Sequence, residues 1–485
     1  MQKRELPEAV CREAFPHDPD FPQLETAVDP KQMLEVFRRH LRPAPGRACW
    51  IEACVPFRFR CRQSTSRCVL QYTLTLSEPG TGRRWEQWVT GLIYTRGGEA
   101  ERMCRELQGA VPREGIPGDW LVFEPVDYIR ELDMLVQVFP FDRKLPHLCR
   151  VLGGSWRGLE SVVLAGLGPG RWRAERGDIK PTRYRTELGA ALKYTVQARE
   201  ALSGQGQARS CYLKVYRHNR REQVEFLRSL SQSAESGAGG FSVIKPIAYV
   251  EELRTVALEE AAGTPLQQVL VEGRDAARAL CAAARAVAAF NQGTLQVQRH
   301  HTRADQCDDV RRASTLVQWA CPEKRADVKA LTLAVTEGLE DVPPSPIHRD
   351  LKTDHIFLSE DRVIFIDLDS AAWGDPVRDP AHLWAHITGR VGMDGLSKER
   401  AQAAAGLFAE EYFARVPKVW RRRFSLHCAG ALIEVAGGIF KRQEPGWRQT
   451  LPELIEEAQR AAAGEPESGA VQANCVRRQS HADIR

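Results

Sequence analysis

The sequence predicts an α+β chain of two or three domains, in which strand-rich units come first and a helical unit follows. The chain has 485 residues, more than one ordinary domain holds. Short runs of alternating aromatic and β-branched residues fill its first half, and alanine-rich helical patterns fill its second half. Hydrophobic residues make up 43% of the chain, which is enough for a large core and excludes wholesale disorder.

The first predicted domain, residues 1–150, is strand-rich. A helical pattern at Pro30–Leu41 precedes strand patterns over Trp50–Leu76. A helical segment, Glu99–Leu107, then separates these from further strands within Trp120–Val138. We expect one sheet with a helix inserted between its strands.

A second strand-rich unit, residues 151–262, follows the same plan. Strand patterns begin at Arg173–Tyr184, and a helix is expected at Arg221–Leu230. CVLQYTLTL of the first unit aligns with AALKYTVQA of the second, and GLIY aligns with LKVY, which sets Lys214 on Leu92. Either the two units are copies of one lobe, or they are unrelated meanders that share an aromatic alternation.

Residues 263–463 are predicted to be helical, and residues 464–485 to form a polar, disordered tail. Alanine-rich helical patterns cover 272–292 and 324–340. The apolar stretch Cys428–Phe440 is short and carries a glutamate, so we interpret it as a buried helix and expect no membrane span.

Charge and cysteine usage indicate a cytoplasmic protein. The net charge of +5 is too small to argue for a nucleic-acid partner, and the first fifteen residues lack an apolar signal core. The 13 cysteines contain no C-x-x-C, and Cys54, Cys61 and Cys68 are too far apart for a zinc ribbon. Their odd number and apolar surroundings favour reduced, buried thiols.

One stretch, Pro346–Ala385, carries an ordered set of carboxylates. Two short apolar runs, Ile356–Leu358 and Val363–Leu368, flank a polar turn, which predicts a β-hairpin. Asp350 stands before the first strand, and Asp367 stands at the far end of the second.

Phosphoryl transfer from a nucleotide needs a group that faces the acceptor hydroxyl and separate oxygen ligands for magnesium. His348 and Asp350 open the kinase pattern H-R-D-x-x-x-x-N as candidate catalytic residues. The metal-binding Asn of that pattern is replaced by His355, whereas the magnesium aspartate is present as Asp367. Asp369 offers a further carboxylate two residues later.

This stretch resembles the aminoglycoside phosphotransferase and choline kinase-like enzymes, which are relatives of the protein kinases. No Asp-Phe-Gly or Ala-Pro-Glu follows HRDLK, and IDLDSAAWGDPVRDPAHL is similar to the ending found in small-molecule kinases. The resemblance implies a bilobal protein-kinase-like fold, with 151–262 as N-lobe and 263–463 as C-lobe. It also implies that Asp379 is buried and braces the catalytic loop. A histidine at the position of His355 also occurs in lipopolysaccharide-kinase-like members.

The resemblance further implies ATP and Mg²⁺ as cofactors and a small-molecule hydroxyl as acceptor. Asp350 would orient or deprotonate the acceptor, and Lys352 would reach the γ-phosphate. Asp367 would bind magnesium, with His355 or Asp369 completing the shell.

The expected N-lobe offers candidates for nucleotide binding. Lys214 lies mid-strand, where a charge is costly unless paired, and Glu222 or Glu225 of the next helix could pair with it. Lys214 would then hold the α- and β-phosphates; the alternative is that it only edges a sheet. By resemblance to the family's hinge, backbone groups from Glu260 to Ala262 would meet adenine.

The usual glycine-rich phosphate loop is missing. Lys180, Arg183 and Arg185 stand in its place, between the expected first two strands. They either supply positive charge to the phosphates or form a solvated hairpin tip.

Three functions stay open: an active small-molecule kinase, a degenerate pseudokinase that serves as a binding or regulatory module, and a kinase of saccharides or lipopolysaccharide core. The sequence indicates neither the acceptor nor the oligomeric state. Four residues stand where the family builds its acceptor pocket, although indoles in a helical lobe are also typical of a core. They are Trp373, Asp375, Trp384 and His386.

The first domain puts Leu92 where the second has Lys214, so we expect it not to bind ATP. We interpret it instead as a cap on the N-lobe.

Overall fold

The computed structural model describes residues 15–464 except for short internal segments. Those segments are 62–66, 110–115, 117, 155–156, 168–169, 237–239, 295–296, 298, 361 and 391–394. The predicted disordered tail lies outside the described residues from residue 465 onward.

The chain forms two compact units, each described here by itself. The first holds the described residues of Met1–Val111 and Gly118–Phe139, together with Trp319–Pro322. The rest of the chain forms the second unit, which takes over at Pro140, ahead of the boundary expected at residue 150.

The first unit is built on an antiparallel five-stranded sheet in the order β1-β2-β3-β5-β4. Its strands are β1 (Trp50–Cys61), β2 (Arg67–Ser77), β3 (Arg84–Tyr94), β4 (Val126–Ile129) and β5 (Met134–Val138). Its helices are α1 (Leu24–Val28), α2 (Pro30–His40), α3 (Glu99–Gln108) and the 3-10 turn η1 (Arg130–Leu132). Helix α2 begins where the Asp29 side chain accepts hydrogen bonds from two backbone N–H groups and a proline occupies the first turn.

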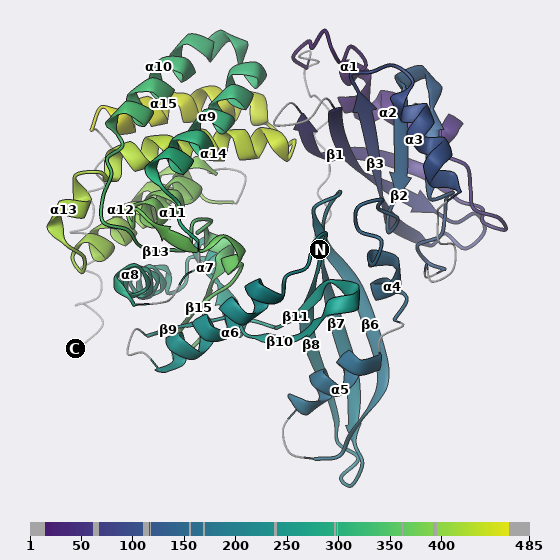
Figure 1. Cartoon of the computed structure of the whole chain (residues 1–485), viewed down its shortest axis with the longest axis horizontal. Coiled ribbons are helices and arrows are strands. Elements are labelled where there is room, and N and C mark those ends of the chain that lie inside the picture. Colours follow the sequence, from purple (N-terminus) through teal and green to yellow (C-terminus); the bar gives the residue numbers. More distant parts are fainter. Residues whose placement is uncertain are drawn as a thin grey trace. The chain divides into compact units, whose positions relative to one another are not determined.

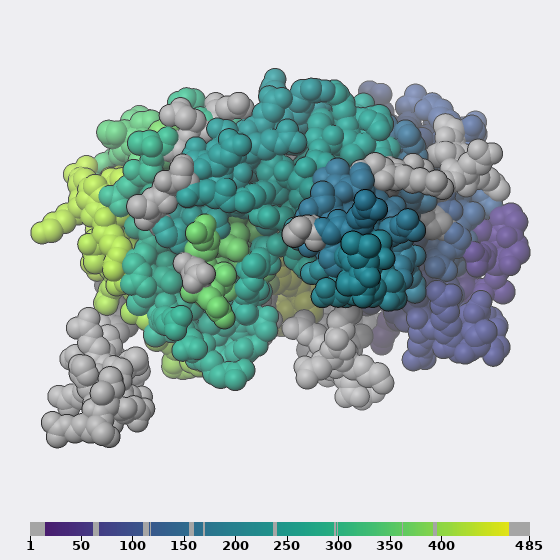
Figure 2. Space-filling model, turned by 90° about the horizontal axis from the view of Figure 1, so that it is seen from below, coloured from purple at the N-terminus to yellow at the C-terminus, as the bar shows by residue number. Residues whose placement is uncertain are grey.

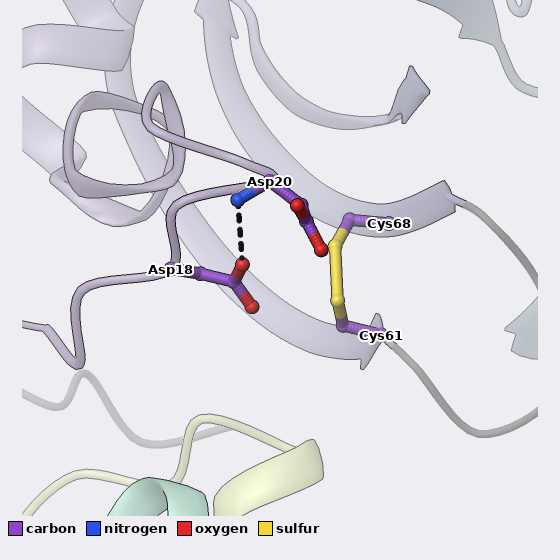
Figure 3. Close-up of a disulfide and its surroundings, with 4 residues drawn as sticks. All are labelled: Asp18, Asp20, Cys61 and Cys68. Atoms are coloured by element: carbon purple, nitrogen blue, oxygen red, sulfur yellow. Dashed lines mark hydrogen bonds between the residues drawn. A yellow bond between two sulfur atoms is a disulfide. The ribbon is translucent and has the colours of Figure 1, made fainter. Parts of the chain in front are cut away.

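The prediction that the cysteines are reduced is wrong for one pair. Cys61 and Cys68 form a disulfide across β1 and β2 (Figure 3). The two residues face each other in the antiparallel register, with Cα atoms 4.4 Å apart, within the range that a disulfide spans. Nine other described cysteines are free thiols.

The sheet of the second unit has the strand order β10-β11-β8-β7-β6 and is also antiparallel. Its strands are β6 (Trp172–Arg185), β7 (Gly189–Glu200), β8 (Gly206–Tyr216), β10 (Pro246–Val250) and β11 (Thr255–Glu259). Helix α6 (Arg221–Ser236) lies beside β10 (Figure 1). Helices α4 (Leu148–Leu152) and α5 (Arg157–Ala165) precede the sheet, and the 3-10 turn η2 (Glu251–Leu253) joins β10 to β11.

The two sheets have the same connectivity. In each, three consecutive strands are followed by a helix and then by two strands joined through a 3-10 turn. Leu92 of β3 pairs with Leu135 of the last strand in its sheet, and Lys214 of β8 pairs with Val256 in the same way. The residues that the sequence alignment equates therefore occupy equivalent places, while the duplication itself stays a prediction.

Helices dominate the remainder of the second unit and form a group separate from its sheet (Figure 1). They are α7 (Leu266–Glu272), α8 (Ala276–Gln292), α9 (Arg303–Ala320), α10 (Arg325–Gly338), α11 (Arg378–Gly389), α12 (Lys398–Phe413), α13 (Lys418–Arg421), α14 (Phe424–Lys441) and α15 (Trp447–Ala462). Green residues near position 400 reach the surface among teal ones (Figure 2).

Helix α14 is the one described helix that is long and apolar enough to cross a membrane, and 72% of it is buried. It packs against α11 and α15, as expected of a core helix.

Short strands between the helices hold the predicted hairpin. They are β9 (Phe241–Val243), β12 (Thr264–Pro265), β13 (Ser345–Ile347), β14 (Ile356–Leu358), β15 (Val363–Phe365) and β16 (Ala372–Gly374). Strands β14 and β15 pair as expected, β9 joins β15, and β12 joins β14. Gly263, with φ +90°, precedes β12, and a Cβ atom there would lie 2.1 Å from the carbonyl oxygen of Leu358. Glycine is therefore required where the segment after β11 enters the helical part.

Candidate active site

The loop after β13, residues 348–355, is held by a buried carboxylate. Asp379, which is fully buried in α11, accepts hydrogen bonds from the backbone N–H groups of His348 (2.7 Å) and Arg349 (2.9 Å). Asn291 of α8 donates to the same carboxylate at 2.9 Å. Arg349 has φ +71°, a strained conformation for a residue with a Cβ atom, so the loop depends on these bonds. Asp379 thus lies where the family resemblance implies.

His348 faces inward. Its side chain is buried, and its Nε2 lies 2.8 Å from the backbone carbonyl oxygen of Ile366, next to Asp367. The structure therefore assigns His348 a positioning role: it joins the loop to the end of β15.

Asp350 presents its carboxylate at the surface of the site, with 42% of the side chain exposed. Lys352 Nζ lies 3.2 Å from this carboxylate. Burial acts to raise the pKa of Asp350, but Lys352, His382 and His355 outweigh it and hold the pKa below its usual value. Asp350 is therefore ionised at neutral pH and accessible to an acceptor.

His355 is oriented by its own loop. Its Nδ1 lies 2.8 Å from the backbone carbonyl oxygen of Asp350, an acceptor only, so Nδ1 carries the proton. Burial, followed by the charge of Lys352, lowers the pKa of His355 to about 4. The imidazole is consequently neutral, and its unprotonated Nε2 lies 3.5 Å from Asp367. A histidine that donates through one nitrogen to a carbonyl and presents the other is typical of metal ligands.

Asp367 follows β15 in a left-handed conformation, with φ +59° and ψ +42°, which aspartate tolerates better than most residues. Burial acts to raise its pKa, but Lys214 and His355 hold the pKa well below the usual range. The ligand atoms of Asp350, His355 and Asp367 all lie within 4.8 Å of one another. Two ionised carboxylates and a neutral imidazole fit one divalent cation, and the hard oxygen donors suit Mg²⁺.

Lys214 reaches this site from β8. Its Nζ donates to Asp367 at 2.6 Å and to Asp369 at 3.2 Å. The predicted pairing with Glu222 or Glu225 does not form, because both glutamates are exposed on α6. Asp369 lies outside the three-residue metal cluster and bonds Lys214 instead.

The basic residues expected at the phosphates take different positions. Lys180, Arg183 and Arg185 lie within β6 itself, so they form neither a loop between strands nor a hairpin tip. Arg183 comes within 3.9 Å of Asp367, whereas Lys180 pairs with the exposed Asp178 on the same strand.

The β6–β7 turn, where the family has its glycine-rich loop, is held by hydrogen bonds to two residues that precede the sheet in the chain. The buried Asp142 accepts hydrogen bonds from the Tyr184 hydroxyl (2.8 Å) and from the Glu187 N–H (2.6 Å). Arg143 donates to the Glu187 carboxylate at 2.7 Å, and Glu187 has φ +63°. Polar contacts thus hold a turn that glycines would otherwise form.

The residues predicted to form the hinge, Glu260 to Ala262, lie in the connection between β11 and β12. Glu260 and Ala262 are exposed in this connection, and the Glu260 side chain pairs with Lys193 of β7 at 2.6 Å. Their location between sheet and helices is the one expected of residues whose backbone meets adenine.

The residues considered for the acceptor separate into two groups. Trp373 and Asp375 line a pocket of about 160 Å³ that His300, His301 and other residues complete. Asp375 is engaged by Arg423, with two contacts of 2.9 Å.

Trp384 and His386, in contrast, do not line this pocket. Trp384 is only 6% exposed and packs against Phe424. It belongs to the helical core, and the His386 ring lies tilted beside that of His382, with 4.8 Å between the ring centroids.

A strand-rich sheet, a helical part and a lysine that meets two aspartates between them define a kinase-like phosphotransferase. The sequence model of the phosphotransferase enzyme family matches residues 195–421 of this chain. The predicted resemblance and class of enzyme are thereby confirmed. No protein of curated function matches the chain.

Several solved structures are similar to the chain. A choline/ethanolamine kinase family protein from Mesorhizobium loti is 13% identical, with a TM-score of 0.39 over 56% of this chain and 89% of that one. A choline kinase from Cryptosporidium parvum is 9% identical, with a TM-score of 0.41 over 62% of this chain and 92% of that one. A GDP complex of an aminoglycoside 2'-phosphotransferase is 12% identical, with a TM-score of 0.40 over 64% and 99%.

Sequence reasoning missed two groups in this region. Tyr216 donates to Asp369 at 2.9 Å, and its position two residues after Lys214 on one strand was the available signal. Asp142 and Arg143 stood in FPFDRKLPHL, a segment assigned to the preceding domain, so nothing linked them to the β6–β7 turn.

Proposed function

We propose that the protein transfers the γ-phosphate of ATP to a hydroxyl group of a small molecule. The observation that carries this proposal is the convergence of Asp350, His355 and Asp367 within 4.8 Å, with Lys214 against the same cluster. In such a set, Asp367 and His355 can hold a divalent cation while Asp350 is left as the exposed base. Lys214 supplies the cation for the phosphates, so the parts that nucleotide-dependent phosphoryl transfer requires are all present.

Each residue has a separate role in this proposal. Asp350, ionised and exposed, accepts the hydrogen bond of the acceptor hydroxyl and takes its proton as the new bond forms. Lys214 holds the α- and β-phosphates, and Lys352 faces the γ-phosphate. Asp367 and the Nε2 of His355 hold Mg²⁺, which when bound neutralises charge on the phosphate oxygens.

The nucleotide would reach the site between the sheet and the helices. Backbone groups from Glu260 to Ala262 are positioned to meet adenine, and Arg183 supplies a further charge beside Asp367. We place the enzyme in the cytoplasm, where ATP is available.

The acceptor is proposed only as a class. The pocket beside Trp373 combines an indole with histidines and carboxylates, a lining suited to a polar molecule with an apolar or cationic face. Both amino alcohols and sugars fit this description.

A degenerate pseudokinase is the second candidate, and the β6–β7 turn favours it. Thr186 and Glu187 are buried in that turn, so its backbone is not open in the way of a glycine-rich loop. A protein of this kind would bind nucleotide or partner without turnover.

Magnesium-dependent consumption of ATP by the purified full-length chain distinguishes the two candidates. We expect hydrolysis that requires Mg²⁺ and is lost in Asp367→Ala, with Asp308→Ala, an exposed carboxylate on α9, as matched control. A screen of amino alcohols, aminoglycosides and sugars with labelled ATP then identifies the acceptor. A folded wild-type protein that binds ATP without turning it over with any acceptor would favour the pseudokinase.

A further inference from the structure

We propose that Asp369 replaces the helix glutamate that a kinase uses to hold its phosphate-binding lysine, and that Tyr216 positions Asp369 for this task. The inference rests on the proposed function, because it assigns Lys214 to the phosphates of ATP. It gives Asp369 a role different from magnesium binding.

The first argument is that the helix does not supply a partner. Lys214 needs an anion beside it when its ammonium group holds a nucleotide. Glu222 and Glu225 are both exposed, and among the described contacts of Lys214 the acid partners are Asp367 and Asp369. The role of the helix carboxylate must therefore be taken by one of these aspartates.

The second argument comes from the alternation of side chains along β8. Residues two apart on a strand point to the same face, so Lys214 and Tyr216 project together. The Tyr216 hydroxyl donates to Asp369 Oδ2 at 2.9 Å, and Lys214 Nζ donates to the same oxygen at 3.2 Å. One strand thus holds Asp369 Oδ2 through two donors.

The third argument concerns Asp367. Asp367 belongs to the cluster that fits a divalent cation, and Asp369 does not. When Asp367 is engaged in holding Mg²⁺, Asp369 is the acid that stays beside Lys214. The other oxygen, Asp369 Oδ1, is buried without a hydrogen-bond partner among the described residues.

A fourth contact ties Asp369 to helix α6 in an indirect way. Arg299 donates to the backbone carbonyl oxygen of Asp369 at 3.0 Å and to the side chain of Gln223 at 3.3 Å. Gln223 lies beside Glu222 on α6. Helix α6 is therefore connected to the anchor of Lys214 through Arg299 and the Asp369 backbone, rather than through a glutamate of its own.

The test compares binding of ATP with and without Mg²⁺, by calorimetry on the full-length chain. Tyr216→Phe changes no charge, and we expect it to weaken binding about tenfold in excess EDTA as well as in Mg²⁺. Tyr128→Phe, which removes a tyrosine–aspartate hydrogen bond of 3.0 Å in the first unit, is the matched control and should bind as wild type. Equal binding by Tyr216→Phe and wild type would overturn the positioning role.

Asp369→Asn and Asp367→Asn remove the same charge from the same site, so their difference isolates the anchoring effect. In EDTA we expect Asp369→Asn to bind ATP more weakly than Asp367→Asn, because Asp367→Asn leaves Lys214 the carboxylate that Tyr216 positions, whereas Asp369→Asn removes it. If Asp369→Asn lowers affinity only when Mg²⁺ is present, Asp369 is a metal ligand and the inference is wrong.

A wild-type chain that fails to bind ATP would refute the proposed function instead, and a second measurement still tests the anchor. We expect the shifts in urea midpoint of Lys214→Met and Asp369→Asn to be less than additive in the double variant. Additive shifts would show that the two residues do not act as a pair.

Discussion

The buried carboxylate of Asp379 holds the loop that carries Asp350. The loss of stability on removing this carboxylate can be worked out from its hydrogen bonds. Its oxygens accept from the backbone N–H groups of His348 and Arg349 and from the Asn291 side chain. Asn291 keeps a second acceptor, the Pro346 carbonyl oxygen at 2.8 Å, so it loses little. The two backbone groups lose their acceptor, and each unsatisfied buried donor costs about 1–3 kcal/mol.

Asp379→Ala is therefore expected to lower the free energy of unfolding by about 2–6 kcal/mol, with both donors left unsatisfied. Asp379→Asn keeps one acceptor oxygen and should lose about half as much. The same change releases the loop that carries Asp350, and a misplacement of about 1 Å can lower turnover about 100-fold. We thus expect kcat to fall in Asp379→Asn while the KM for ATP changes little.

Urea denaturation followed by circular dichroism measures the first effect, and steady-state kinetics of ATP consumption measures the second. Asp308→Asn, which changes an exposed carboxylate on α9, serves as the control and should match wild type in both. An Asp379→Asn variant with wild-type midpoint and wild-type kcat would refute the argument that this carboxylate holds the catalytic loop.

Four further predictions concern the site and its surroundings. Asp350→Asn should lower kcat by about 10²- to 10⁴-fold and change ATP affinity only a few-fold in calorimetry; a parallel collapse of affinity would indicate a structural role. His355→Asn should preserve or raise activity, because asparagine offers an oxygen to the metal, and complete loss in a folded variant would contradict this. Burial acts to raise the pKa of Asp375, but His427 and Arg423 hold it below the usual value, so Asp375→Asn should cost about 3–5 kcal/mol of stability at neutral pH. This difference from wild type should shrink as the pH falls below about 4 in urea titrations, because protonation removes the same charge; a pH-independent difference would argue against the ion pair. A fragment of residues 151–485, which lacks Asp142, should melt at a lower temperature and bind ATP more weakly than residues 140–485, and equal behaviour would show that the β6–β7 turn needs no support.

The local parts of the fold and site were predictable, because short-range patterns encode them. The β14–β15 hairpin, the strands of both sheets and the helix at α6 follow from alternation and turn residues near each element. The cluster of Asp350, His355 and Asp367 was equally predictable from the sequence, because all three residues lie in or next to the β14–β15 hairpin.

Long-range pairings were less predictable, for a physical reason. Lys214 lies 153 residues before Asp367, and strand alternation does not indicate which acid a buried lysine will meet. The glutamates of α6 were close in sequence, and the helix places them in solvent. Lys180 and Arg185 were assigned to a loop because the family has its phosphate loop between the first two strands, although the strand pattern itself already reached Tyr184.

The shared connectivity of the two sheets indicates where they diverge chemically. Tyr128 pairs with Leu135 in the first sheet, and Tyr249 pairs with Val256 in the second, so the rows through Leu92 and Lys214 run in register to a tyrosine at the edge. Within this conserved frame the lysine position is apolar in the first unit, and Leu92 is fully buried there. Burying an unpaired ammonium group at that place would cost several kcal/mol, whereas leucine adds to the core. Leu92 therefore stabilises the core at this position, and we expect the first unit to lack the phosphate-binding cation that Lys214 would supply in the second.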